Sequence, residues 1–162
     1  MVSAMWSKKC RCFAVGTGED GKTRNAYLAL DAQIWPLLAL PGAAKTYGAA
    51  LGTAQARLAD GDGFSYSQAK EGLWTEGTAQ VALYLKLSGG DAGALTTALD
   101  TMRAPDGSYY AANTSELPTG FMLETDPTQP RQYFHIAHLA ALSWAAIAQQ
   151  GYNPFTRTSA LP

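Results

Sequence analysis

The sequence predicts an all-α fold, a partial α/α toroid of about five helices preceded by a short N-terminal β segment. The segments expected to be helical alternate between two kinds, one apolar on nearly every side and the other with a single apolar stripe. A helix that is apolar all round must be covered on all sides, whereas a striped helix borders solvent. This alternation is what an inner ring of helices wrapped by an outer ring requires, and consecutive inner helices are then parallel.

Length and composition indicate a single globular domain. The chain has 162 residues, of which 47% are hydrophobic and 15% are charged, and this suits one domain of about 100–200 residues. The formal net charge of −1 gives no electrostatic footprint for nucleic acid or an anionic membrane. No apolar run reaches the roughly 18 residues of a membrane span, and residues 1–10 lack the pattern of a signal peptide. We expect no nucleic-acid or membrane partner, and a cytoplasmic location only by default.

The first 26 residues are expected to form a strand and turns. Residues 10–15, CRCFAV, have the pattern of a short strand, and the GTGEDGKT that follows is typical of a turn. Its glycine spacing matches a dinucleotide-binding fingerprint, but no βαβ unit follows and two acidic residues lie where a pyrophosphate would bind. Cys10 and Cys12 are interpreted as ordinary thiols, because a structural zinc site needs four ligands and both histidines are far away in the sequence.

Helical hairpins are expected to occupy residues 27–155, with a tail after them. Apolar periodicity and the residues that end each segment predict five helices, over 25–40, 43–59, 75–88, 91–103 and 131–150. Pro36 lies inside the first and predicts a kink, or a firm start near Trp35. Residues 113–130 are rich in Thr, Pro and Ser and are expected to form a long irregular connection, and loops of such length are often functional.

The N-terminal ends of the first, third and fifth helices are expected to meet at one mouth of the ring, because parallel neighbours begin at the same end. These ends carry carboxylates, imidazoles, amides and aromatic rings, namely Asp31, Gln33, Trp35, Trp74, Glu76, Gln80, Tyr133, His135 and His138. Tyr109 and Tyr110 precede the fifth helix and are expected at the same mouth. Aromatic faces with polar groups suit a sugar, and paired carboxylates are the machinery of glycoside hydrolysis.

Glu76 has two interpretations. Its carboxyl group lies beside Trp74, an environment that can raise a pKa enough for general-acid work. The position equally suits an acidic residue in the first turn of a helix, which the macrodipole and the free backbone N–H groups favour, with Thr75 as a candidate N-cap. Spacing alone favours this structural interpretation, and the same alternative holds for Asp31.

The histidine pair also has two interpretations. His135 and His138 are three residues apart, and on a helix they would share a face on which they could bind a metal or move a proton. Two histidines with hydrogen bonds satisfied inside the ring fit the pattern equally well. No third ligand is near in the sequence, so we expect neither a metal nor another cofactor.

Three stretches, LDAQIWPLLAL, GLWTEGTAQVALYLKLSGG and HIAHLAALSWAAIAQQGYNPF, occur in an order that resembles the C-terminal part of bacterial proteins of the six-hairpin glycosidase-like superfamily, some of them encoded near polysaccharide-synthesis genes. GTGEDGKTRN and DGSYYAAN are also similar to that pattern, and the resemblance covers most of residues 13–155. It implies an (α/α)6 toroid with a carbohydrate-directed cavity lined by Asp31, Trp74, Glu76 and His138.

The resemblance has one departure, because a full six-hairpin toroid needs twelve helices and this chain supplies about five. It therefore implies a fragment, a truncated gene product, or a subunit that completes its ring by association. The open sides of the first and fifth helices would favour a homo-oligomer, unless a missing N-terminal half of the toroid covers them.

The function expected from these features is that of a carbohydrate-active domain, glycoside hydrolase-like if it is an enzyme. Glu76 would be the general acid or base, Asp31 the second carboxylate and His138 a residue that orients the substrate. The expected substrate-binding residues are Trp35, Trp74, Gln80, Tyr109, Tyr110 and His135. In a polysaccharide lyase, His138 and Tyr109 would instead handle the proton. The other class is a non-catalytic domain that binds glycan or serves as a scaffold.

Overall fold

The computed structural model describes residues 2–162. The prediction of an all-α partial toroid is wrong, because the fold is mixed: 40% of the chain is helical and 21% is strand. Within the described residues lie four small two-stranded antiparallel sheets. The strands of three of these sheets have only two residues each, which is too short to give the alternating pattern that identifies a strand in a sequence.

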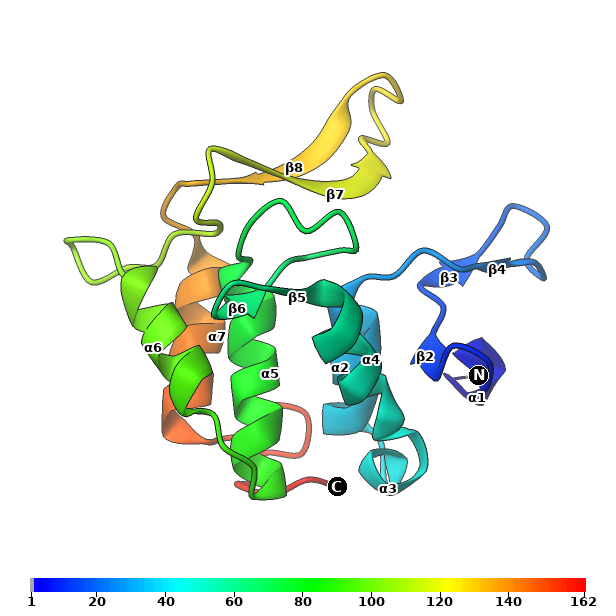
Figure 1. Ribbon diagram of the computed structural model, residues 1–162, viewed down its shortest axis with the longest axis horizontal. Helices are drawn as coiled ribbons and strands as arrows, with labels where there is room; N and C mark the ends of the chain where they lie inside the picture. Colours follow the sequence, from blue (N-terminus) through cyan, green and yellow to red (C-terminus); the bar gives the residue numbers. More distant parts are fainter. Residues whose placement is uncertain (1) are drawn as a thin grey trace.

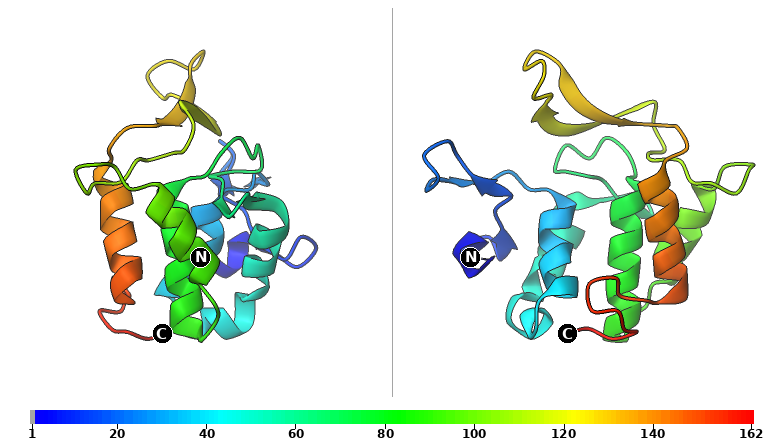
Figure 2. Two further views of the ribbon diagram at one scale, coloured as in Figure 1. Left: turned by 60° about the vertical axis from the view of Figure 1, so that its left-hand side comes forward. Right: turned by 180° about the vertical axis from the view of Figure 1, so that it is seen from behind.

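Three parallel helices form the centre of the fold (Figure 1), namely α2 at Leu30–Ala39, α5 at Thr75–Ser88 and α7 at Leu139–Gln150. Of these, α5 lies in the middle and packs against both others. Two further helices run in the opposite direction and pack on α2 and α5 respectively, namely α4 at Ala49–Leu58 and α6 at Gly93–Thr101. Both views of Figure 2 agree that the three central helices begin at the same end of the molecule.

The central helices differ in how fully they are covered. Helix α5 is buried from Gly77 to Tyr84, as its apolar sequence predicts. Helix α7 is not: Leu139 is 77% exposed, and its buried residues are only the three alanines Ala141, Ala145 and Ala148. The prediction that the fifth helix is covered on every side is therefore wrong for residues 2–162, because this helix lies at the edge of the layer.

The longest hairpin lies over the N-terminal ends of α5 and α7 (Figures 1 and 2). Its strands are β7 at Glu116–Met122 and β8 at Pro130–Phe134, with Leu117 paired to Tyr133. The expected irregular connection over 113–130 is thus largely an antiparallel hairpin. The expected start of the fifth helix near residue 131 is also wrong, since these residues pair with β7 and the helix begins only at Leu139.

The remaining elements are short. Helices α1 and α3 occupy Val2–Met5 and Ala43–Tyr47. The single helix expected over 43–59 is divided at Gly48, which lies between α3 and α4. The other strands pair as hairpins, namely β1 Trp6–Ser7 with β2 Cys12–Phe13, β3 Gly16–Thr17 with β4 Arg24–Asn25, and β5 Ala59–Asp60 with β6 Gly63–Phe64.

Gln33 ties the N-terminal segment to the helix layer. Its side chain is fully buried. The Phe13 backbone N–H donates to Gln33 Oε1 at 2.8 Å, and Gln33 Nε2 donates to the Phe13 carbonyl oxygen at 2.9 Å. This reciprocal pair satisfies both ends of the amide, as burial of a polar group requires. The sequence placed Gln33 at the mouth with the candidate site residues, whereas the structure uses it to anchor β2 on α2.

Cys10 and Cys12 form a disulfide, with their Cα atoms 5.3 Å apart. The interpretation of two ordinary thiols is therefore wrong. The two residues lie at the end of the turn between β1 and β2, and the intervening Arg11 has a positive φ of 55°, so the turn brings both side chains to one side. No helix in the described part of the chain is both long enough and apolar enough to cross a membrane.

Candidate functional site

Two carboxylates meet where the central helices begin. Asp31 and Glu76 are each the second residue of their helix, α2 and α5. Because these helices are parallel neighbours, both side chains lie at the same end of the layer. Their proximity has an electrostatic effect: in addition to the larger effect of burial, the charge of Asp31 raises the pKa of Glu76, and both charges raise the pKa of Tyr133 on β8.

Glu76 is the strongly perturbed acid of the site. Burial of the carboxyl group, with a smaller contribution from the negative charge of Asp31, raises the pKa of Glu76 to about 7. Its Oε1 accepts a long hydrogen bond of 3.4 Å from Gln80 Nε2, one turn further along α5. Burial also raises the pKa of Asp31, while the backbone N–H of Ala32, 2.7 Å away, opposes that shift. Both acids therefore favour their neutral form more than a free carboxyl group does.

The raised pKa of Glu76 leads to a prediction about stability. That prediction distinguishes a general acid from an acidic residue that caps the helix. Its pKa in the folded protein, about 7, lies above its ordinary value of 4.5, so the folded state binds the proton more tightly than the unfolded state. The resulting stabilisation is complete below pH 4.5 and is lost as the pH rises through about 7. Because glutamine does not titrate, a Glu76→Gln variant should not lose stability over this pH range.

We therefore expect Glu76→Gln to unfold like the wild type at about pH 4 and to be more stable at about pH 8, by about 1–2 kcal/mol once solvent screening of a partly exposed group is allowed for. Urea unfolding at both pH values measures this difference. A helix-capping acid behaves in the opposite way, because its ionised form interacts favourably with the helix terminus. Loss of stability in the variant at pH 8 would thus assign Glu76 the capping role.

An aromatic cluster borders the two acids. Trp74, which immediately precedes α5, is only 2% exposed. Its ring centroid lies 4.8 Å from that of Tyr66 and 5.4 Å from that of Tyr133, and Tyr133 lies 6.2 Å from the His138 ring. Trp74 is thus part of the wall behind the site, and its ring packs against other aromatic rings of the protein.

The two tyrosines of this cluster are held in their neutral form. Burial, followed by the charges of Glu76 and Asp31, raises the pKa of Tyr133 to about 12. Burial and the charge of Asp31 also raise the pKa of Tyr66. Arg131 opposes both shifts. Each phenol therefore keeps an O–H group at neutral pH that can donate a hydrogen bond.

A cavity of about 580 Å³ opens beside α2. Its polar lining residues are Asp31, Tyr66 and Arg131, and its walls include Trp35, which is 40% exposed. Most other lining residues are apolar, namely Val2, Met5, Phe13, Ala14, Val15, Ala29, Ala32, Pro36, Ala39, Leu40, Phe121 and Phe155. Carboxyl, phenol and guanidinium groups thus border an otherwise apolar hollow, which is the usual character of a small-molecule site.

Several polar atoms at this end of the layer are buried without a partner. In residues 2–162, the buried side-chain atoms that lack a hydrogen bond are Ser65 Oγ, Trp74 Nε1, Gln80 Oε1 and His138 Nδ1. Three of the four belong to residues that the sequence assigned to the site, and Ser65 is adjacent to Tyr66. Such atoms are costly to leave unpaired, and they are therefore donors and acceptors that a ligand or water could satisfy.

The other predicted site residues lie further along the same end. Tyr109 is 2% exposed, and its hydroxyl accepts hydrogen bonds from Arg103 at 2.9 Å and from Gln149 at 3.0 Å. Tyr110 stacks on His135 with ring centroids 3.9 Å apart, and His135 Nδ1 lies 2.8 Å from the Ala112 carbonyl oxygen. Tyr110, Ala112 and His135 lie in the extended segments after α6 and before α7, whereas the Tyr109 hydroxyl reaches Gln149 in the last turn of α7 and so points away from the mouth.

The expected helical histidine pair is wrong. His135 lies before α7, and His138 is the N-cap residue, with extended backbone angles of φ −138° and ψ 128°. They therefore share no helix face. Within the described chain, no group of three or more His, Cys, Asp or Glu side chains is placed to hold a metal ion.

Sequence reasoning missed Tyr66 and Arg131, and it gave Tyr133 no role. Tyr66 lies in the connection between β6 and α5, and Arg131 and Tyr133 lie on β8. Tyr66 reaches the acids through the loop before α5, and Arg131 and Tyr133 reach them through the β7–β8 hairpin, neither of which helical periodicity reveals. The sequence of β8, PRQYF, has no apolar-polar alternation that could have identified it as a strand.

Comparisons with protein-family models, with curated proteins and with solved structures found no match to this chain. The functional argument therefore depends on the residues of the site.

Proposed function

We propose that this protein is a carbohydrate-active domain with glycoside hydrolase-like chemistry, in which Glu76 is the general acid and Asp31 the second carboxylate. The observation that carries the proposal is the pKa of Glu76, about 7, in a half-buried position next to another acid. An acid with a pKa near the working pH transfers protons most effectively. Two carboxyl groups with different environments are the usual means by which glycosidases assign acid and base roles.

In the proposed reaction, protonated Glu76 donates its proton to the glycosidic oxygen as the bond to the sugar breaks. The departing oxygen keeps the bonding electron pair, and positive charge develops on the sugar ring. Ionised Asp31 stabilises that charge. Water then bonds to the charged ring carbon and gives up a proton to the carboxylate pair, so that the sugar is released as a neutral product and the acid is restored. The Tyr66 hydroxyl group donates a hydrogen bond to the sugar, and Trp35 offers an exposed aromatic face within the cavity. Glu76 and Tyr133 are not among the residues that line this cavity, so the sugar must extend from it towards them.

Polysaccharide lyase chemistry has less support. It would require Tyr109 to exchange a proton with the substrate. The Tyr109 hydroxyl is buried and already accepts hydrogen bonds from Arg103 and Gln149, so it is not free to approach a sugar. A non-catalytic glycan-binding domain is the second candidate, because the apolar cavity walls and the exposed Trp35 favour binding whether or not a bond is cleaved.

The test is a screen of the wild-type chain against polysaccharides and chromogenic glycosides between about pH 5 and pH 8. We expect release of reducing ends, with a rate that falls as the pH rises through about 7, because Glu76 must be protonated to act. Products that absorb as unsaturated sugars would indicate a lyase. Binding without cleavage would support the glycan-binding alternative, and neither binding nor cleavage across the panel would contradict a carbohydrate-directed function.

A further inference from the structure

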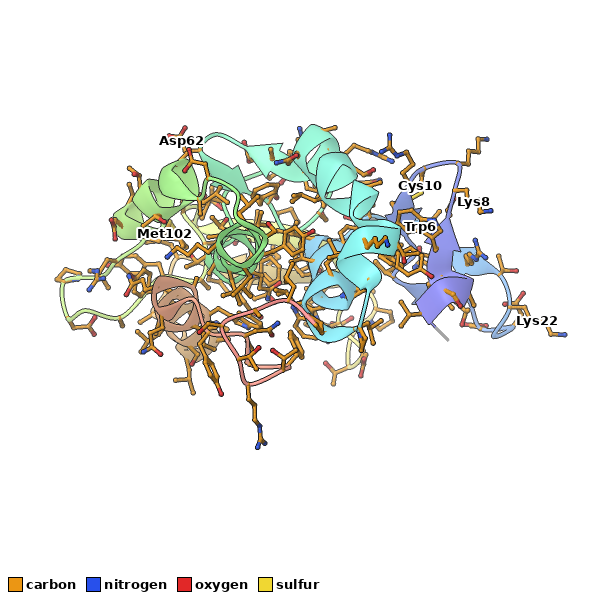
Figure 3. The ribbon with its side chains drawn as sticks, turned by 90° about the horizontal axis from the view of Figure 1, so that it is seen from below. Trp6, Lys8, Cys10, Lys22, Asp62 and Met102 are labelled. Carbon is orange, nitrogen blue, oxygen red and sulfur yellow. A yellow bond between two sulfur atoms is a disulfide. The ribbon has the colours of Figure 1, made fainter. Side chains whose placement is uncertain are left out.

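The Cys10–Cys12 disulfide lies at the edge of the molecule, on the turn between β1 and β2 (Figure 3). We propose that it is a thiol–disulfide exchange site whose reaction partner is a small anionic thiol. This proposal is independent of the carbohydrate function, because none of the residues that carry it borders the two acids.

The bridge contributes little to holding the hairpin together. Strands β1 and β2 are already paired, Trp6 with Phe13 and Ser7 with Cys12, and the Arg11 backbone N–H donates to the Ser7 carbonyl oxygen at 2.8 Å. A disulfide that encloses a single intervening residue removes little entropy from the unfolded chain, since the stabilisation grows with loop length. Reduction of the bridge should therefore leave the fold intact.

Contacts with α4 also hold the turn in place. The Thr53 hydroxyl lies 2.9 Å from the Arg11 carbonyl oxygen and 3.2 Å from the Cys10 carbonyl oxygen. The Thr53 hydroxyl shares its proton between these oxygens and holds Cys10 and Arg11, while pairing with Ser7 holds Cys12, so the two cysteines stay near each other whether or not they are bonded. The reduced pair can thus re-form its bridge readily.

The residue that the bridge encloses has an uncommon backbone conformation. Arg11 has φ 55°, a left-handed conformation that is unfavourable for a residue with a side chain. The bridge therefore encloses an unfavourable backbone conformation, which the hydrogen bonds of Arg11 with Ser7 and Thr53 hold in place. Strained and accessible disulfides are the labile ones that take part in exchange.

The two sulfur atoms are not equally accessible. Cys12 is buried, with 6% of its surface exposed, whereas Cys10 is half-buried and borders a hollow of about 330 Å³ next to α4. Arg11 and Arg57 also line this hollow. The hollow therefore gives a thiolate access to Cys10. The positive charges of Arg11 and Arg57 favour a partner that carries negative charge, although Arg57 Nη2 also donates to Gln68 Oε1 at 3.4 Å.

The exchange proceeds in two steps. A thiolate attacks Cys10 Sγ, the Cys10–Cys12 bond breaks, and Cys12 leaves as a thiolate while a mixed disulfide forms on Cys10. A second thiolate attacks the external sulfur of that mixed disulfide, so that Cys10 leaves as a thiolate and the two small thiols are joined. Two electrons pass from the two small thiols to the cysteine pair, and the reverse sequence oxidises it.

The experiment equilibrates the full chain, under native conditions, with mixtures of reduced and oxidised glutathione, a thiol that carries carboxylates. Free thiols are then alkylated and counted by intact mass. We expect both cysteines to be reduced at a ratio of reduced to oxidised glutathione that leaves the long-loop disulfides of a reference secreted protein oxidised. The circular dichroism spectrum of the chain should not change. A chain that never forms the bridge, or a bridge as resistant as the reference, would overturn the proposal.

Single variants test which of the two sulfur atoms is attacked and whether the attacking thiol is preferred when it carries negative charge. Cys12→Ser should form a mixed disulfide with glutathione at least about tenfold faster than Cys10→Ser, because thiolate access controls the rate. Arg57→Glu should slow exchange with glutathione about three- to tenfold and leave exchange with neutral 2-mercaptoethanol unchanged. Equal rates in the two cysteine variants would contradict attack at Cys10. If Arg57→Glu does not fold, added salt gives the same comparison, and an equal salt effect on both thiols would contradict the anionic partner.

Discussion

Replacing Glu76 by glutamine is expected to reduce glycoside cleavage by about 10²–10⁴-fold, the usual contribution of a positioned general acid. Glutamine keeps the size of the side chain but has no proton to give to the leaving oxygen. The environment of Glu76 supports this role, since burial and the charge of Asp31 raise its pKa to about 7. The measurement is kcat/KM for the substrate that the panel identifies, in wild type and variant at the same pH.

The matched control is Glu71→Gln, the same change at an exposed glutamate just before α5, which should leave kcat/KM unchanged. Asp31→Asn gives a second readout. Because the charge of Asp31 raises the pKa of Glu76, its removal should move the high-pH limb of the rate profile to lower pH in whatever activity remains. Full activity in Glu76→Gln would rule out Glu76 as the acid, even if the protein still cleaves glycans through other groups.

The helices illustrate how far sequence patterns determine this fold. The third and fourth helices were expected over 75–88 and 91–103 and lie at Thr75–Ser88 and Gly93–Thr101, because apolar periodicity defines both and Gly89 ends the first of the two. The fifth is shorter than predicted, since residues near its expected start pair with β7. Pairing between distant segments competes with local helical periodicity, and a single sequence does not reveal which of the two prevails.

The candidate site was likewise predicted from the sequence only in part. Asp31 and Glu76 were found because an acid at the start of a helix has a recognisable position, and parallel helices bring such positions together. Tyr66 and Arg131 were missed because loops and a hairpin carry them to the acids. Trp74 was predicted at the site, but its predicted role differs from the one that the structure shows. Its place beside Glu76 in sequence suggested a sugar-binding face, whereas its ring is buried against Tyr66 and Tyr133.

Burial of Trp74 leads to the second large effect. Trp74→Ala should destabilise the protein by about 3–5 kcal/mol, the cost of removing a large aromatic side chain from a core. The ring packs against both Tyr66 and Tyr133, which also contact each other, and directly over Gly77, where a Cβ atom would collide with it. Urea unfolding at a fixed pH measures the loss.

Trp35→Ala provides the matched comparison, because Trp35 is the same residue type but is 40% exposed. It should cost much less stability while weakening ligand binding, since its ring lines the cavity. Trp74→Phe should also cost less than Trp74→Ala, because phenylalanine keeps most of the packing and removes the buried Nε1–H that has no partner within residues 2–162. Equal losses for Trp74→Ala and Trp35→Ala would show that the wall behind the two acids is not part of the stable core.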